Sequence, residues 1–286
     1  MNAALPTHAA PPATPPAGMH ADEWAARIEL AACYRVFAML GWTEMIYNHI
    51  TLRLPASVCG DDKQFLINPF GLHYSEVTAR NLVKINLQGQ VLDGSPHPVN
   101  PAGFTVHAAI HDGLPGAHCV MHTHTTAGVA VACLKDGLQQ TNFYTAQLHN
   151  MVAYHAFEGI TIHADEAPRL LKSIGDKPAV ILRNHGLLAW GATLPQTFAI
   201  LWTLQRACEI QMATFAMGGA QAATVLTWAN VGGFMGSLSF GFVMARFGIR
   251  WPTAFMLLIG SLGVASFGLG RETLSAWQWA TMPQSI

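Results

Sequence analysis

Residues 119–126 read CVMHTHTT, an apolar run that leads into two histidines, His122 and His124, and ends in small hydroxylated residues. Alternate side chains of a strand point to the same face of a sheet, so these two imidazoles would project side by side. Two imidazoles arranged in this way are suited to binding one metal ion. A third histidine, His185, follows another apolar run at residues 179–183. The pattern alone leaves open either a shared metal site or two unrelated strand ends.

The composition changes sharply after Met217. Only three arginines and one glutamate of the 15 basic and 16 acidic residues lie beyond this point, whereas all 14 histidines and all five cysteines precede it. The first part is typical of a soluble protein, and the second has the composition of a membrane segment. A net charge of −1 without a basic cluster argues against a nucleic-acid partner. Scattered cysteines and the lack of a secretory signal indicate reduced thiols and a cytoplasmic domain.

Hydrophobic periodicity divides the chain into short strands and helices that alternate irregularly. Residues 1–20 are rich in alanine and proline and are expected to be a disordered leader. For residues 21–217 the irregular alternation predicts a three-layer α/β domain with a mixed sheet. Residues 146–154 fit either type of element. We predict strands at residues 46–54, 65–68, 82–87, 118–124 and 179–183, and helices at residues 22–40, 104–112, 127–134, 164–174 and 194–217.

Six short blocks of the sequence follow one another along the chain: YNHITLR (47–53), INPFGLHY (67–74), NPAGFTVH (100–107), HTHT (122–125), RNHGLL (183–188) and ACEIQ (207–211). Taken in this order, they resemble the class II aldolase/adducin family. Six ordered blocks are far more specific than any single motif. The resemblance spans about residues 23–217 and is closest to an adducin-like bacterial branch.

This resemblance implies a three-layer α/β/α domain, commonly a tetramer, with zinc at a subunit interface. The metal ligands of the family's aldolases fall on His122, His124 and His185. Three imidazoles leave one coordination position open, as expected of catalytic zinc, with Mn²⁺ or Fe²⁺ as alternatives. Such an ion would hold the oxygens of a small sugar-derived hydroxy-carbonyl substrate during carbon–carbon cleavage, decarboxylation or epimerisation. By the same resemblance, the substrate-binding residues are Asn48, His49 and Gly71, although His49 is equally plausible as a packing residue.

One departure from the family concerns the catalytic carboxylate. Sugar-phosphate aldolases of this family carry a glutamate four residues before the histidine that matches His107, and this chain has Gly103 there. Glycine can serve neither as a metal ligand nor as an acid or base. The small hydroxyl residues that grip a substrate phosphate are replaced by Pro and Ala at positions 101–102. Phosphate recognition and the usual base are therefore both in question.

Other side chains are candidates for the missing acid or base. His107 and His111 lie near position 103, and imidazole has a suitable pKa. The alternative is that they are buried helix residues with satisfied hydrogen bonds. Tyr154, or else Tyr144, matches a family tyrosine that donates a proton across the subunit interface. These possibilities leave two functions open: a metal-dependent lyase, or an adducin-like scaffold that keeps the fold without the chemistry.

The C-terminal part contains two long apolar stretches, at residues 220–244 and 253–270. Each is long enough, or nearly so, to cross a bilayer. Together with the Arg-Phe-Gly segment at residues 246–248, they resemble one helical hairpin of the major facilitator transporters. One hairpin of such a fold implies no transport function. We expect a chimeric junction near residues 218–224, with inner-membrane association or a pair of buried core helices as the alternatives.

Overall fold

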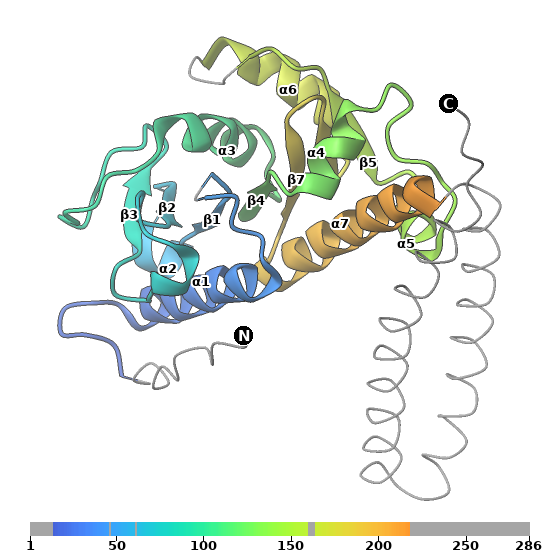
Figure 1. The fold of residues 1–286 in the computed structure, drawn as a ribbon. Helices are drawn as coiled ribbons and strands as arrows, with labels where there is room; N and C mark the ends of the chain where they lie inside the picture. The colour runs from blue at the N-terminus through green and yellow to red at the C-terminus, as the bar shows by residue number, and fades with distance from the viewer. Residues whose placement is uncertain (1–13, 46, 61, 160–163, 218–286) are drawn as a thin grey trace, which may run out of the picture. The chain divides into compact units, whose positions relative to one another are not determined.

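The computed structural model describes residues 14–45, 47–60, 62–159 and 164–217 (Figure 1). Its centre is a seven-stranded sheet with the order β3-β2-β1-β4-β7-β6-β5. Neighbouring strands are antiparallel except for the parallel pair β5–β6, which confirms the mixed sheet. The strands are β1 (His49–Arg53), β2 (Gln64–Ile67), β3 (Val83–Asn86), β4 (Cys119–Thr123), β5 (Val152–His155), β6 (Ala179–Leu182) and β7 (Gly186–Gly191).

Helices cover both faces of the sheet, so the domain has three layers (Figure 1). On one face, α1 (Ala21–Leu40), α4 (Thr126–Cys133) and α7 (Leu194–Met217) pack on a core that includes Cys119 and Met121 of β4. On the other face, α3 (Pro101–Gly113) and α6 (Ala167–Ile174) pack on a core that includes Val120. Since strand side chains alternate, His122 lies on the face that α3 and α6 cover. The remaining elements are α2 (Ala56–Cys59), α5 (Phe143–Gln147), η1 (Tyr74–Glu76) and η2 (Ala164–Glu166).

Most predicted elements are present, with informative differences at their ends. β4 ends at Thr123, so His124 lies in the turn after the strand rather than within it. The ambiguous residues 146–154 contain the end of α5 and most of β5. Two elements were not predicted, α2 and β7. The β7 sequence GLLAWG shows no alternation because the strand lies between β4 and β6 and is buried on both faces.

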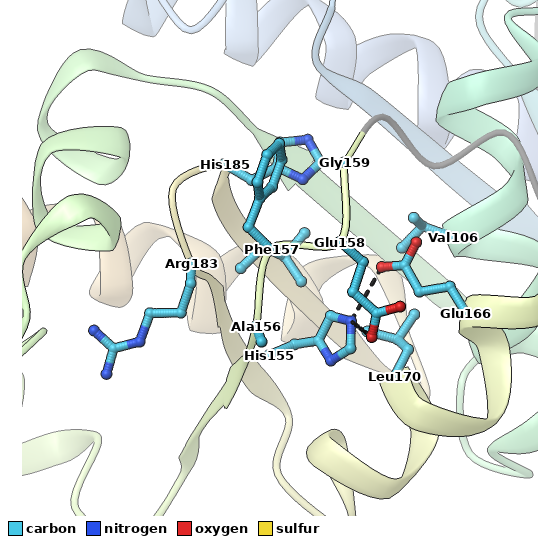
Figure 2. Close-up of a pocket in the computed structure, with 11 residues that line it drawn as sticks. Val106, His155, Ala156, Phe157, Glu158, Gly159, Glu166, Leu170, Arg183 and His185 are labelled. Atoms are coloured by element: carbon cyan, nitrogen blue, oxygen red, sulfur yellow. Dashed lines mark hydrogen bonds and ion pairs between the residues drawn. The ribbon is translucent and has the colours of Figure 1, made fainter.

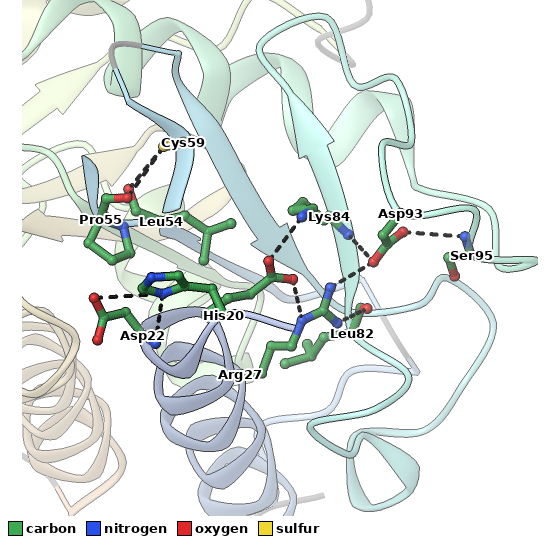
Figure 3. Close-up of polar contacts among 11 residues, drawn as sticks. His20, Asp22, Arg27, Leu54, Pro55, Cys59, Leu82, Lys84, Asp93 and Ser95 are labelled. Carbon is green, nitrogen blue, oxygen red and sulfur yellow. Dashed lines mark hydrogen bonds and ion pairs between the residues drawn. The ribbon is translucent and has the colours of Figure 1, made fainter. Parts of the chain in front are cut away.

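A buried ionic network ties the start of α1 to β3 (Figure 3). The guanidinium of Arg27, 2% exposed, bonds the Glu23 carboxylate at 2.9 Å and the Asp93 carboxylate at 2.7 Å, and it donates to the Leu82 carbonyl at 2.6 Å. The Lys84 ammonium reaches the second Glu23 oxygen at 2.9 Å. Every charge of the network therefore has an opposite partner, as burial demands.

Most of the leader and both apolar C-terminal stretches fall outside the described residues. The predicted transporter-like hairpin at residues 220–270 therefore has no structural account. Among residues 14–217, leaving out the short gaps at 46, 61 and 160–163, no helix is both long and apolar enough to span a membrane.

Candidate metal centre

Three histidines from two turns and a strand end converge on one point. His122 is the fourth residue of β4, His124 follows that strand, and His185 lies in the turn between β6 and β7. One ring nitrogen from each of the three lies within 4.8 Å of the others. The ring centroid of His122 is 4.4 Å from that of His124 and 4.8 Å from that of His185. The structure thus brings together the three histidines that the sequence predicts as ligands.

Hydrogen bonding sets which nitrogen of His122 faces this point. The Nδ1 atom lies 2.8 Å from the Leu187 carbonyl oxygen, which can only accept, so Nδ1 carries the proton. The lone pair is then on Nε2, which lies 2.8 Å from Nε2 of His124. A ligand histidine commonly donates its other N–H to a backbone carbonyl in this way. The chemistry of the donor set therefore fits a divalent ion.

The turn that carries His185 depends on two special backbone positions. Asn184 has φ +56°, a left-handed conformation that asparagine tolerates better than most residues. At Gly186 an added Cβ would lie 2.3 Å from the Thr123 carbonyl oxygen. Only glycine lets the start of β7 pass this close to the end of β4. This close approach places His185 beside the other two imidazoles.

Burial keeps these imidazoles in the neutral form that metal binding requires. Desolvation, reinforced by the nearby His185, lowers the pKa of His124 to about 4. Burial holds the pKa of His122 well below its usual value, and repulsion from the neighbouring imidazoles adds to the effect. The pKa of His185 is also lowered by burial, against an opposing contribution from Glu166. All three rings are therefore neutral at pH 7.

His49 fills the space in front of Gly103. The residue pairs with His122 across β1 and β4, and their ring centroids are 5.1 Å apart. A Cβ added at Gly103 would lie 2.7 Å from Cδ2 and 2.8 Å from Nε2 of His49. Position 103 therefore has no room for a side chain while His49 keeps this orientation. The sequence shows the glycine, but it gives no signal that His49 would occupy the space.

His107 and His111 lie behind His49 in a buried chain of hydrogen bonds. His49 Nδ1 is 2.9 Å from His107 Nε2, and His107 Nδ1 is 2.7 Å from the Thr51 hydroxyl. The same hydroxyl is 2.7 Å from His111 Nε2, and His111 Nδ1 is 2.6 Å from the Ala117 carbonyl oxygen. Burial lowers the pKa of His49 and of His111 to about 3, and that of His107 as well. Both predicted catalytic histidines are thus buried groups with satisfied nitrogens.

Asn48 connects the histidines to a carboxylate that sequence reasoning missed. Its side-chain Oδ1 accepts from the His124 backbone N–H at 2.7 Å, and its Nδ2 donates to Glu44 Oε2 at 2.5 Å. The Tyr74 hydroxyl donates to the backbone carbonyl oxygen of Asn48. Glu44 and the next residue, Met45, have φ of +31° and +58°, and burial raises the pKa of Glu44. Such strained positions cluster at functional sites, and the sequence gives no sign of them.

Two other predicted site residues have different surroundings. The Tyr154 hydroxyl accepts from the Leu138 backbone N–H at 3.0 Å, and the Arg183 guanidinium lies 4.3 Å from its ring centroid. These contacts fit a structural role within one chain. Gly71 has φ +102°, which favours glycine. Its neighbour Phe70 lines a cavity of about 10 Å³ with Asn48, His49, Ile67, Asn68, Asn100 and Gly103.

The segment after β5 lies beside His185 (Figure 2). Phe157 is 52% exposed, and its ring centroid is 6.2 Å from that of His185. Behind it, buried His155 bonds Glu166 Oε1 through Nε2 at 3.0 Å and Ser173 Oγ through Nδ1 at 3.0 Å. These bonds attach the segment to α6 and leave an exposed aromatic ring next to His185, one of the three converging histidines.

Comparison with known proteins agrees with this geometry. Residues 28–212 match the family model described as the class II aldolase and adducin N-terminal domain. A provisionally named aldolase class 2 protein of Pseudomonas aeruginosa is 43% identical over 210 residues, which are 73% of this chain and 79% of the relative. Rat (Rattus norvegicus) alpha-adducin is 46% identical over 203 residues, which are 70% of this chain but only 27% of the adducin.

A solved structure has the same fold. It is an aldolase II superfamily protein from Pseudomonas syringae, 41% identical in sequence, with a TM-score of 0.67 over 71% of this chain and 81% of that chain. The family match covers well over half of the chain, and the P. aeruginosa relative is matched over most of its length. The chain therefore belongs to the class II aldolase and adducin family.

Proposed function

We propose that this chain is a divalent-metal-dependent lyase of the class II aldolase type that acts on a small hydroxy-carbonyl compound. The observation that carries the proposal is the convergence of His122, His124 and His185 within 4.8 Å. A purely structural domain has no need of three neutral imidazoles at one point, one of them buried and two half-buried. Zn²⁺ suits a set of imidazole ligands best, with Mn²⁺ or Fe²⁺ as alternatives.

The reaction is carbon–carbon cleavage, decarboxylation or epimerisation. Each of these builds up negative charge next to a carbonyl group, which a bound divalent ion stabilises as a Lewis acid. The chain's own residues bind and orient the substrate. Asn48 holds the His124 backbone in place, while His49 and Phe70, the residue before Gly71, border the small cavity beside Gly103. Because residues 101–102 are Pro and Ala, an unphosphorylated substrate is favoured over a sugar phosphate.

Metal analysis of the full-length chain tests the proposal. After purification and incubation with Zn²⁺, followed by removal of free metal, we expect about one equivalent per chain. The His185→Ala variant should lose this metal, whereas His97→Ala, which changes a histidine outside the cluster, should retain it. Less than about a tenth of an equivalent in the unaltered chain would refute a metal enzyme.

The second candidate function is an adducin-like scaffold without catalysis. It is favoured by His49 filling the space at Gly103, where the family's aldolases carry a carboxylate, and by 46% identity to alpha-adducin over 203 residues. A scaffold predicts little metal, and His122→Ala should then leave the association of the protein with its partners unchanged. Loss of a bound equivalent of metal in that variant would favour the enzyme instead.

We also propose that the chain forms a homo-oligomer, a tetramer by its family resemblance. Exposed apolar side chains near the metal centre support this: Met45 is 77% exposed, and Tyr47 and Phe157 are each 52% exposed. Apolar surface of this kind is often covered by another protein. Light scattering of the full-length chain should give a mass about four times that of the chain, and a monomer mass would contradict the proposal.

A further inference from the structure

The buried chain of hydrogen bonds behind His49 has a fixed starting point at the Ala117 carbonyl. A carbonyl oxygen can only accept, so the Nδ1 atom of His111, 2.6 Å away, must carry a proton. In a neutral ring the other nitrogen is then a lone pair. His111 Nε2 therefore accepts the hydrogen of the Thr51 hydroxyl, 2.7 Å away.

The same reasoning passes through the next two side chains. Once the Thr51 hydroxyl hydrogen points to His111, its oxygen is free to accept the Nδ1–H of His107 at 2.7 Å. The Nε2 atom of His107 is then a lone pair, and it accepts the Nδ1–H of His49 at 2.9 Å. Each proton position leaves the next atom only one role, either donor or acceptor. The direction of every hydrogen bond in this series therefore follows from the Ala117 carbonyl.

We propose that this series of hydrogen bonds fixes the tautomer of His49, so that its Nε2 carries a lone pair, which accepts a hydrogen bond from a hydroxyl group of the ligand. His107, Thr51 and His111 are positioning residues, because they act through His49 and not on the ligand. The identity of the ligand that donates to His49 rests on the function proposed above. The tautomer of His49 does not, since it follows from hydrogen bonds within the protein.

Burial excludes the other arrangements of protons. The side chains of Thr51 and His107 are fully buried, and His111 is 2% exposed. An additional proton on His107 would set its Nε2–H against the Nδ1–H of His49, 2.9 Å away, where both rings are buried. The interior therefore favours one neutral form of all three rings.

The open lone pair of His49 borders a cavity of the right size and polarity for one hydroxyl group. Asn48, Asn68 and Asn100 line it together with Gly103. Its volume is about 10 Å³, which is space for about one water-sized group. A Cβ added at Gly103 would lie 2.7 Å from Cδ2, 2.8 Å from Nε2 and 3.3 Å from Cγ of His49, so Gly103 packs on the face of the imidazole ring. The lone pair of Nε2 lies in the plane of the ring, away from this contact.

Nitrogen-15 NMR of the histidine rings tests the proposal. The full-length chain is labelled on its histidine nitrogens and treated with a chelator, so that the result does not depend on metal binding. The signals of His49 are assigned by their loss in His49→Gln. We expect His49 to be protonated on Nδ1 and unprotonated on Nε2, and a proton on Nε2 in the unaltered chain would overturn the proposal.

Matched variants of Thr51 test the positioning role. Thr51→Val removes the hydroxyl without changing the shape of the side chain, and it should allow His107 and His49 to reverse, so that a proton is found on His49 Nε2. Thr51→Ser keeps the hydroxyl and should retain the original tautomer. If the tautomer of His49 is unchanged in Thr51→Val, the buried series of hydrogen bonds does not control it. Because the chelator removes metal from these NMR samples, failure of this test is distinct from failure of the metal analysis.

Discussion

The Nε2 atom of His49 lies 2.8 Å from the point at which a side chain on Gly103 would begin. A Cβ contact this short is not tolerated without movement of one of the partners. The two residues are therefore a coupled pair: the glycine at position 103 and the ring orientation at position 49 require each other. The His49 imidazole occupies the space that a side chain at position 103 would need.

A methyl group at position 103 should reveal this coupling. Overpacking costs about 1–3 kcal/mol, while replacing a glycine within α3 by alanine returns about 1 kcal/mol of helix propensity. We therefore expect Gly103→Ala to lower the free energy of unfolding in urea. The loss should disappear when Gly103→Ala is made in a His49→Ala background.

Gly116 provides the control for this experiment. An added Cβ there would lie 3.6 Å from the Trp190 ring, an ordinary contact. Gly116→Ala should change the free energy of unfolding by less than about 0.5 kcal/mol. A Gly103→Ala variant as stable as Gly116→Ala would show that His49 moves aside at no cost.

The Asn48 amide should support metal binding without touching the ion. Its Oδ1 holds the His124 backbone N–H at 2.7 Å. Removal of groups that orient metal ligands typically weakens metal affinity by about 10–100-fold. We expect such a loss of Zn²⁺ affinity in Asn48→Ala, measured by competition with a chelating dye. Asn81→Ala, which removes an amide bonded to Thr78 and Glu76, should bind Zn²⁺ as tightly as the unaltered chain.

The Arg27 network should contribute strongly to stability because it is buried. Arg27→Met keeps the length of the side chain but leaves the Asp93 carboxylate without its ionic partner and Glu23 with Lys84 alone. Breaking a buried ion pair in this way costs about 3–5 kcal/mol of unfolding free energy. The control is Lys63→Met, which removes an exposed pair with Asp112 and should cost less than about 1 kcal/mol. Equal losses in thermal or urea unfolding would contradict this account.

Local sequence patterns predicted the elements with strong periodicity and the residues that follow them. The helix predicted from residue 194 begins there and continues to Met217, the last described residue, because its amphipathic pattern is long and uninterrupted. The convergence of His122, His124 and His185 was also predictable, since each follows an apolar run and matches a family motif. β7 was missed because a strand buried on both faces lacks alternation.

The contacts of His49 could not be predicted from local patterns. They depend on the register between β1 and β4, which pairs His49 with His122, and on the packing of α3 against β1. Both are long-range properties that the local sequence does not encode. The same holds for Glu44, whose role follows from two positive φ values and a hydrogen bond to Asn48. The sequence located three histidines that lie together in the structure, and the structure added the residues in contact with them.

The buried histidines behind His49 should make the fold sensitive to acid. The pKa of His111 falls from 6.5 to about 3 on burial, so between these values the unfolded chain binds a proton that the folded chain does not. Stability is therefore full above pH 6.5 and decreases as the pH falls towards 3, by up to about 1.4 kcal/mol per pH unit for each such histidine. The variant His111→Gln cannot be protonated, so its unfolding free energy should fall less steeply over this range in urea titrations at several pH values. His118→Gln, which changes an exposed histidine, should keep the slope of the unaltered chain. Parallel curves for His111→Gln and the unaltered chain would mean that His111 takes up its proton without unfolding the domain.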